Sequence, residues 1–169
     1  MKTIINVVKT EDQPAYCVQA DKTASEDKAI EKALKILESR LRKPGSALTS
    51  PETTKTYLRF KLAELEHEVF SVIFLNNQHQ VIEYRELFRG TIDGASVYPR
   101  EVLKACLQLN AAAVIFAHNH PSGINEPSSA DRNITDKLKA ALNMVDIRTL
   151  DHLIIGSGDP YSFAEHGLI

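Results

Sequence analysis

The sequence has few cysteines, no long apolar run and no surplus of charge of one sign. Cys17 and Cys106 lie far apart and share no C-x-x-C spacing, so we expect neither a disulfide scaffold nor a cysteine-rich zinc site. Such cysteine usage is typical of the reducing cytoplasm, which is the compartment we expect. No stretch approaches the ~18 apolar residues that indicate a membrane-spanning helix. The apolar run after Met1 is also too short for a signal peptide.

The charge balance gives no general preference for nucleic acid. The chain has 20 Lys and Arg against 22 Asp and Glu, a formal net charge of -2, whereas nucleic-acid-binding proteins usually carry a basic surplus. A local basic cluster, Arg40, Arg42 and Lys43, follows a predicted helix, where an interaction with the helix C-terminus is favoured over one with phosphate. A length of 169 residues with 43% hydrophobic content predicts a globular domain with a buried core.

The first part of the chain, residues 1–46, is predicted to be an extension of the main domain. Residues 3–8 and 15–20 are expected as two short strands that form a β-hairpin. Ser25 is expected to cap an amphipathic helix, whose apolar positions recur at helical spacing as far as a Pro-Gly stop. The main domain is then predicted to span residues 47–169.

The main domain alternates predicted helices with apolar strands. Residues 69–75 and 111–117 are almost wholly apolar, so both strands should lie inside a sheet that is covered on both faces. The alternation predicts an α/β (α+β) fold with a mixed β-sheet flanked by helices. The helices are expected to begin at Ser50-Pro51, Pro99 and Ser128. The other strands are expected at 80–88 and 147–156, and a closing strand or turn is expected from 161. The side chains expected to pack inward from the helix after Pro99 are Val102, Leu103, Cys106, Leu107 and Leu109.

A polar segment after the second apolar strand carries the residue types of a metal site. In "HNHPSGINEPSSAD" (residues 118–131), His118 and His120 are two positions apart, and such residues of an extended chain point to the same side. A turn with Pro and Gly can return Asp131 on the first turn of the next helix. Two imidazoles and a carboxylate suit a catalytic zinc site with one position open for water. The spacing therefore predicts that His118, His120 and Asp131 bind Zn²⁺.

The same residues also fit a purely structural interpretation. Ser128-x-x-Asp131 has the pattern of a capping box, and Asp131 gains from the positive helix end with or without a metal. His118 and His120 could then be histidines of a surface loop. Two histidines at the exit of a buried strand favour the metal site, beside which the Ser128 hydroxyl could donate to a developing oxyanion.

This segment and its flanks resemble a known family. "HNHPSGINEPSSAD" is similar to the H-x-H-x(7)-S-x-x-D signature of JAB/MPN+ (JAMM) metallopeptidases. The surrounding "GTIDGASVYPREVLKACLQLNAAAVIFAHNHPSG" and "DIRTLDHLIIG" are similar to the RadC branch of that superfamily, and the resemblance covers roughly residues 47–169. It implies the three-layer, cytidine-deaminase-like JAB/MPN architecture and the same three zinc ligands.

The resemblance also implies two catalytic roles. It makes Ser128, rather than Ser129, the residue that supports the tetrahedral intermediate. Members of the superfamily use an upstream glutamate as the general base for the zinc-bound water, and Glu68, at the start of the first buried strand, is the best match. The structural alternative is that Glu68 is an exposed charge at the strand entry. The other glutamates considered for this role are Glu64, Glu66, Glu83 and Glu126.

Several further polar residues are interpreted as structural. Asp151-His152 could support a ligand imidazole from behind, but a buried structural histidine is the favoured interpretation. The segment 91–96 could border a substrate groove, and an ordinary loop is favoured. Glu101 is expected to interact with its helix dipole. The remaining histidines, expected at the surface, are His67, His79 and His166.

The residues and the resemblance together predict a zinc-dependent metallopeptidase or isopeptidase, which acts on a peptide or protein with a metal-activated water. The alternative is a DNA-associated accessory protein with a structural or vestigial metal site, which the charge balance does not support. A zinc deaminase is set aside, because its chemistry needs H-x-E and P-C-x-x-C. Longer RadC-like proteins carry an N-terminal helix-hairpin-helix region. This chain has no G-x-G hairpin there, so it is more similar to short RadC-like proteins of mobile elements and prophages.

Overall fold

The structure is a computed structural model that describes three stretches of the chain, residues 19–41, 51–90 and 96–169. The chain divides into two compact units, Met1–Ala33 and Leu34–Ile169. The boundary predicted between residues 46 and 47 stays a prediction, because residues 42–50 are outside the described stretches. Also wholly or mostly outside them are the strands predicted at 3–8 and 15–20 and the loop predicted at 91–96.

Helix α1 spans Gln19–Leu41 and begins earlier than expected. Residues 19–20, predicted to end a strand, belong to its first turn, and Ser25, predicted to cap it, lies inside it. Both predictions were wrong, because "QADKTASEDK" is rich in helix formers and contains neither Gly nor Pro, so the helix extends past Ser25. In the second unit, Leu34 and Leu37 are half-buried and pack against the core, as their helical spacing predicted.

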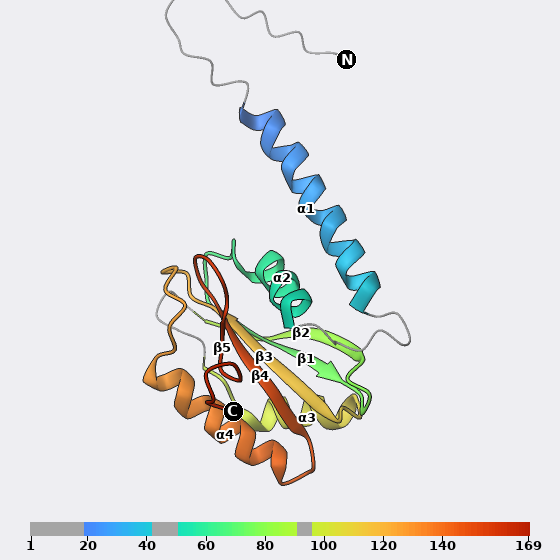
Figure 1. Cartoon of the computed structure of the whole chain (residues 1–169), viewed down its shortest axis with the longest axis vertical. Coiled ribbons are helices and arrows are strands. Elements are labelled where there is room, and N and C mark those ends of the chain that lie inside the picture. The colour runs from blue at the N-terminus through green and yellow to red at the C-terminus, as the bar shows by residue number, and fades with distance from the viewer. Residues whose placement is uncertain (1–18, 42–50, 91–95) are drawn as a thin grey trace, which may run out of the picture. The chain divides into compact units, whose positions relative to one another are not determined.

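A mixed five-stranded sheet forms the centre of the second unit (Figure 1). Its strand order is β2-β1-β3-β4-β5; β3 and β4 are parallel, and the other neighbouring pairs are antiparallel. This is the mixed sheet with flanking helices that the sequence predicted. The strands are β1 (Val69–Leu75), β2 (Val81–Arg89), β3 (Ala113–Asn119), β4 (Arg148–Ile155) and β5 (Tyr161–Ser162), and the helices are α2 (Pro51–Leu62), α3 (Pro99–Gln108) and α4 (Ser129–Asn143).

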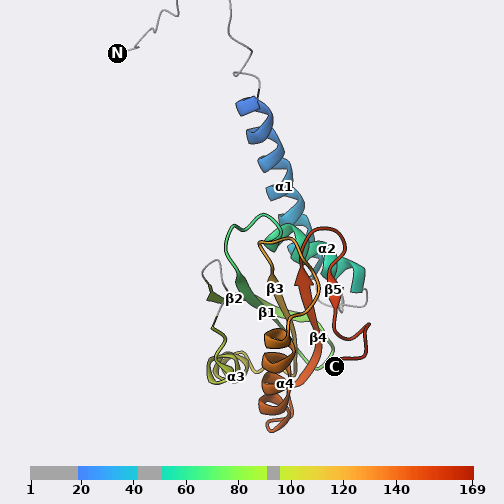
Figure 2. The same cartoon turned by 90° about the vertical axis from the view of Figure 1, so that its left-hand side faces the viewer.

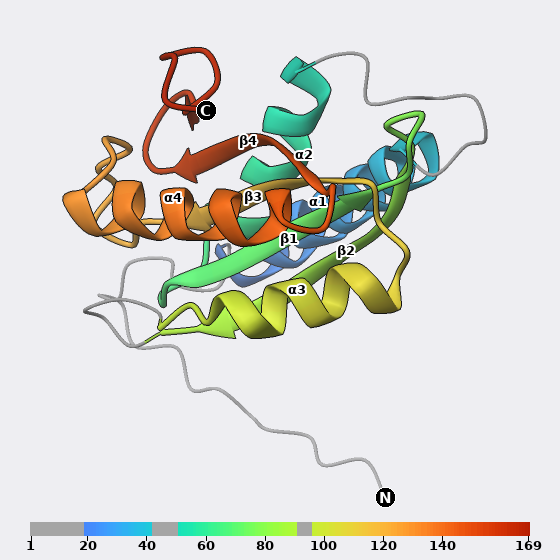
Figure 3. The same ribbon diagram turned by 90° about the horizontal axis from the view of Figure 1, so that it is seen from below.

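Helices cover both faces of the sheet, which gives the unit three layers (Figure 2). Every residue of β1 and β3 is buried, as their continuous apolar sequences predicted. Side chains alternate between the two faces along a strand, so these strands contribute to two separate cores. One core packs against α2 and includes Leu58, Leu62, Ile73 and Ile115. The other packs against α3 and α4 and includes Phe74, Cys106, Phe116 and Leu138 (Figure 3).

Two details of the sequence prediction were wrong. Leu107 was expected to pack inward, but its side chain is 59% exposed. The buried face of α3 instead carries Val102, Ala105 and Cys106, and Leu107 falls off this helical stripe. The third strand, predicted at 111–117, is shifted toward the C-terminus. It continues through Asn119, because β1 supplies partners as far as His118 and β4 supplies partners as far as Asn119.

A membrane span is not found among the helices that the structure describes. None of them combines the length and the apolar composition that crossing a bilayer requires.

Candidate metal centre

His118 lies near the end of β3, and its side chain is only 1% exposed. The sheet pairs it with Phe70 on β1 and with Ile154 on β4, so its backbone is held from both sides. Its ring stacks on Phe70, with ring centroids 6.2 Å apart. The interpretation of His118 as a histidine of a surface loop was therefore wrong.

His120 follows the strand and turns one ring nitrogen toward His118. Its Nδ1 lies 2.6 Å from the backbone carbonyl oxygen of Ile124. A carbonyl only accepts hydrogen bonds, so Nδ1 carries the hydrogen and Nε2 keeps a lone pair. Nε2 of His120 lies 2.9 Å from Nε2 of His118. The Nε2 atoms of the two rings thus lie next to each other.

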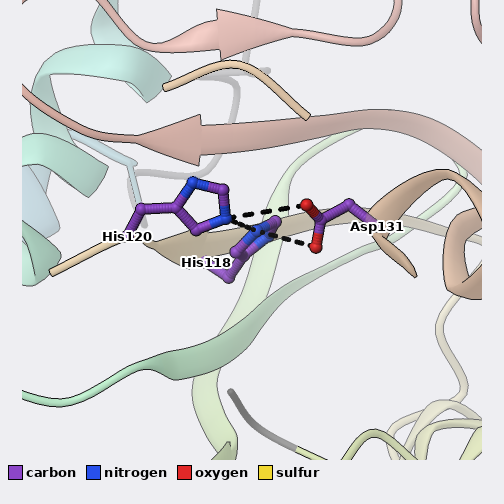
Figure 4. A group of neighbouring side chains, drawn as sticks. All are labelled: His118, His120 and Asp131. Atoms are coloured by element: carbon purple, nitrogen blue, oxygen red, sulfur yellow. Dashed lines mark hydrogen bonds and ion pairs between the residues drawn. The ribbon is translucent and has the colours of Figure 1, made fainter. Parts of the chain in front are cut away.

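Asp131 reaches that point from the first turn of α4 (Figure 4). Its Oδ1 lies 3.2 Å from Nε2 of His118, and its Oδ2 lies 3.6 Å from Nε2 of His120. One possible ligand atom from each of the three side chains lies within 4.8 Å of the others. The residues that the H-x-H spacing and the later aspartate singled out are thus brought together, in a group that can hold a metal ion.

Asp131 also completes the capping box. The backbone N–H of Ser128 donates to Oδ2 of Asp131 over 2.7 Å, and Oγ of Ser128 accepts from the Asp131 N–H over 3.1 Å. The Ser128 hydroxyl itself donates to Oδ2 over 2.5 Å. The capping box and the metal site are compatible, because Oδ1 of Asp131 remains directed at His118 while Oδ2 takes part in the cap.

The electrostatics of the three side chains favour a cation between them. Burial raises the pKa of Asp131, but contacts with His118, His120 and Ser128 lower it more, so its pKa lies far below its ordinary value and the group is a carboxylate. The nearby carboxylate of Asp131 raises the pKa of His120, although burial opposes this. A carboxylate beside two imidazole nitrogens is stabilised by a positive charge, which a proton or a metal ion can supply.

A pocket of about 400 Å³ opens onto these side chains, and Glu68 lines it. Glu68 immediately precedes β1, whose Phe70 pairs with His118, and its negative charge helps to raise the pKa of His120. None of the other glutamates considered lines this pocket: Glu64, Glu66 and Glu126 are exposed, and Glu83 forms an ion pair with Arg85.

Asn119, the middle residue of "HNH", holds the segment that carries Glu68. Its Oδ1 accepts from the Val69 N–H over 2.8 Å. Its Nδ2 donates to the carbonyl oxygens of Leu65 and His67 over 3.2 and 3.0 Å. The side chain of Asn119, 2% exposed, thus fixes the backbone on both sides of Glu68. This role of Asn119 could not be predicted from the sequence, because it depends on contacts between residues about fifty positions apart.

Two buried residues lie behind His118. Nε2 of His152 is 2.8 Å from Nδ1 of His118, and Oγ1 of Thr135 is 2.7 Å from Nδ1 of His152. Burial lowers the pKa of His152 well below its ordinary value, so its ring is neutral. His152 is buried, as predicted, but it also contacts a candidate ligand. Thr135 was missed, although a polar residue on the buried stripe of α4 that includes Leu138 and Leu142 was a usable signal.

A comparison with protein families identifies the relationship. Residues 48–168 match the model of the RadC-like JAB domain. The chain belongs to the RadC-like JAB-domain family. The resemblance inferred from "HNHPSGINEPSSAD" and its flanks is thereby confirmed, and the mixed sheet between helices is consistent with the JAB/MPN fold.

Close relatives of this RadC-like chain occur in several bacteria. A UPF0758 protein of Vibrio cholerae serotype O1 is 56% identical over 154 residues, which cover 91% of this chain and 96% of the relative. A UPF0758 protein of Marinobacter nauticus is 55% identical over 88% of this chain and 66% of its own length. One of Nitrosococcus oceani is 58% identical over 83% of this chain and 62% of its own length. The chain thus spans about two thirds of the latter two relatives.

Five other polar residues that the sequence singled out do not line the pocket: Asp151, His166, His67, His79 and Glu101. Asp151 accepts from the Ser162 hydroxyl over 2.7 Å and from the Ala164 N–H over 2.9 Å, so it fastens the C-terminal segment. His166 is exposed, as expected, whereas His67 and His79, expected at the surface, are half-buried. Glu101 lies in the first turn of α3, as predicted.

Proposed function

We propose that this RadC-like protein is a zinc-dependent hydrolase of amide bonds in peptides or proteins, including isopeptide bonds. One observation carries the proposal: Glu68 lines the same pocket as His118, His120 and Asp131. Amide hydrolysis requires a Lewis acid and a proton acceptor. A metal ion held by the three side chains would be the Lewis acid, and the neighbouring carboxylate would be the proton acceptor.

The donor set supports zinc as the metal. Two imidazole nitrogens and one carboxylate oxygen are a known ligand set of catalytic zinc, and three protein ligands leave a position free. Imidazole also suits copper, iron and nickel, so metal analysis has to identify the ion. When bound, zinc supplies a Lewis acid that lowers the pKa of water toward about 7 and polarises a carbonyl group.

The side chains around the pocket would divide the remaining work. Glu68 would accept a proton from the attacking water and pass it to the leaving amine, which a carboxylate within reach of both groups can do. Ser128 would donate to the developing oxyanion. In the structure its hydroxyl hydrogen is directed at Oδ2 of Asp131, so this role requires the hydroxyl to rotate. Phe70, Val97 and Ile134 form apolar wall beside these groups.

The cellular setting is also part of the proposal. Two distant cysteines fit a protein of the reducing cytoplasm. A peptide or protein is the expected substrate, because amide bonds are what this combination of groups would cleave.

The metal is tested first. Purified full-length protein, analysed by inductively coupled plasma mass spectrometry, should contain one zinc ion per chain, and His118→Ala and Asp131→Asn should lose it. His166→Ala, which removes an exposed histidine away from the site, is the matched control and should keep zinc. A wild-type protein without stoichiometric metal, or ligand variants that retain it, would contradict the metal site.

The chemistry is tested with a proteome-derived peptide library and isopeptide-linked peptides, with cleavage products identified by mass spectrometry. Glu68→Gln should retain zinc and lose cleavage by about 10²-fold or more, because a general base contributes on that order. Glu66→Gln, at an exposed position nearby, should cleave like the wild type. A zinc-loaded wild-type protein that cleaves none of these bonds would contradict the hydrolase.

A further inference from the structure

A chain of hydrogen bonds runs from His118 into the interior, away from the pocket. It passes from Nδ1 of His118 to Nε2 of His152 (2.8 Å) and from Nδ1 of His152 to Oγ1 of Thr135 (2.7 Å). It ends at the backbone carbonyl oxygen of Asp131, 2.5 Å from Oγ1 of Thr135. The side chains of His152 and Thr135 are 0% and 1% exposed. Solvent therefore supplies no alternative partner for these atoms.

The direction of every hydrogen bond in this chain follows from its last member. The carbonyl oxygen of Asp131 can only accept, so the Thr135 hydroxyl uses its one hydrogen there. Oγ1 of Thr135 must then accept from His152, which places a hydrogen on Nδ1. A second hydrogen would put a charged ring in a fully buried position among Phe70, Phe116 and Phe163, which is costly, so the ring carries only this one. Nε2 of His152 is left with a lone pair and accepts from Nδ1 of His118. His118 therefore carries its hydrogen on Nδ1, and its Nε2 lone pair faces His120 and Asp131.

We propose that Thr135 and His152 are positioning residues that hold His118 in the Nδ1–H tautomer and so prepare its Nε2 to bind a metal ion. The proposal rests on the metal centre of the proposed function. Hydrogen-bond partners of this kind orient ligand imidazoles in metalloproteins. Here the partner is a second imidazole, either nitrogen of which can carry the hydrogen. Thr135 decides which nitrogen of His152 donates and which one accepts.

Aromatic rings pack around His152 and restrict its orientation. Its ring stacks on Phe163 with centroids 4.9 Å apart and contacts the edges of Phe70 and Phe116 at 5.5 and 5.9 Å. The relay also returns to the backbone of Asp131, another candidate ligand. It thus connects the ligand on β3 with the ligand on α4 through a residue of β4, and one hydroxyl group influences two of the three ligands.

Thr135→Val and Thr135→Ser form a matched pair for the test. Valine has nearly the shape of threonine but lacks the hydroxyl, whereas serine keeps it. Zinc affinity, measured by competition with a chromogenic chelator, should fall by about 10- to 100-fold in Thr135→Val and stay within about threefold of the wild type in Thr135→Ser. Equal affinity of Thr135→Val and the wild type would overturn the proposal, and so would an equal loss in both variants.

A second measurement reads the tautomer directly and does not depend on metal. Nitrogen-15 NMR of the imidazole rings in the metal-free protein, at a pH where they are neutral, distinguishes Nδ1–H from Nε2–H. His118 should be the Nδ1–H form in the wild type and in Thr135→Ser, and a mixture in Thr135→Val. A wild-type His118 protonated on Nε2 overturns the proposal even if Thr135→Val does not fold.

The two proposals fail in different ways. If the wild type takes up no zinc, the proposed function fails, while the NMR measurement still decides the direction of the relay. If zinc binds and amide bonds are cleaved but His118 is the Nε2–H form, the proposed function stands and the relay is wrong.

Discussion

At the scale of single residues, the site depends on side chains that perform two tasks at once. Asp131 directs one carboxylate oxygen at His118 and uses the other to close the capping box with Ser128. The cap is therefore part of how the candidate ligand is oriented, because the hydrogen bonds from Ser128 restrict rotation of the carboxylate. One carboxylate can therefore belong both to a helix-capping pattern and to a metal-binding pattern.

Ser128→Ala tests the role of Ser128 in the helix cap and its proposed role in cleavage. Loss of the cap should lower the free energy of unfolding by about 1 kcal/mol, within the usual range for N-cap serines, measured by urea denaturation. Zinc stoichiometry should be unchanged, because Ser128 supplies no ligand, whereas cleavage under the proposed function should slow.

The control is Ser129→Ala, at the adjacent exposed position on the first turn of α4. Its stability should differ from the wild type by less than ~0.5 kcal/mol, as is usual for surface substitutions. If the two variants were equally destabilised, the capping box would not be the cause.

At the scale of elements, the site forms where the ends of three segments meet. The end of β3 carries His118 and Asn119, the beginning of α4 carries Asp131, and the segment before β1 carries Glu68. Asn119 joins the first of these segments to the last through three hydrogen bonds. Its neighbour His118 faces the opposite way along the strand, so consecutive residues of β3 position the candidate ligand and the candidate base.

Asn119→Asp tests this connection with almost no change in shape. The carboxylate cannot donate to the carbonyl oxygens of Leu65 and His67, and each lost partner leaves a poorly solvated polar group that costs about 1–3 kcal/mol. We expect the free energy of unfolding to fall by a few kcal/mol, and cleavage by the zinc-loaded variant to fall more than its zinc content.

Asn125→Asp is the matched control, since Asn125 donates a single hydrogen bond, to the carbonyl oxygen of Asp159 at the surface. Its stability should change by less than ~1 kcal/mol. A variant at residue 119 that is as stable as this control, with wild-type cleavage, would contradict the positioning role of Asn119.

At the scale of the whole molecule, the periodicity of the sequence predicted the layers of the fold. It did not predict the contacts between residues that are distant in the sequence. Apolar strands and amphipathic helices are local patterns, so β1, β3 and α4 were found with small shifts in their bounds. The three candidate ligands were found because two lie on one strand end and the third on the next helix. The contact between Thr135 and His152 could not be predicted from the sequence, because it requires α4 to pack against β4.

The charge of the whole molecule predicts how it behaves toward nucleic acid. Non-specific binding depends on neutralising phosphates with a basic surface, and the chain has a formal net charge of -2. In gel-shift assays with single-stranded and duplex DNA at about 50 mM salt, the full-length protein should cause no shift at concentrations where a basic protein of similar size does, around 10⁻⁶ M.

His118→Ala should behave identically, because the site is not expected to contact DNA. A shift that weakens as salt is added would instead favour the DNA-associated alternative, and its persistence in His118→Ala would separate that function from the metal site.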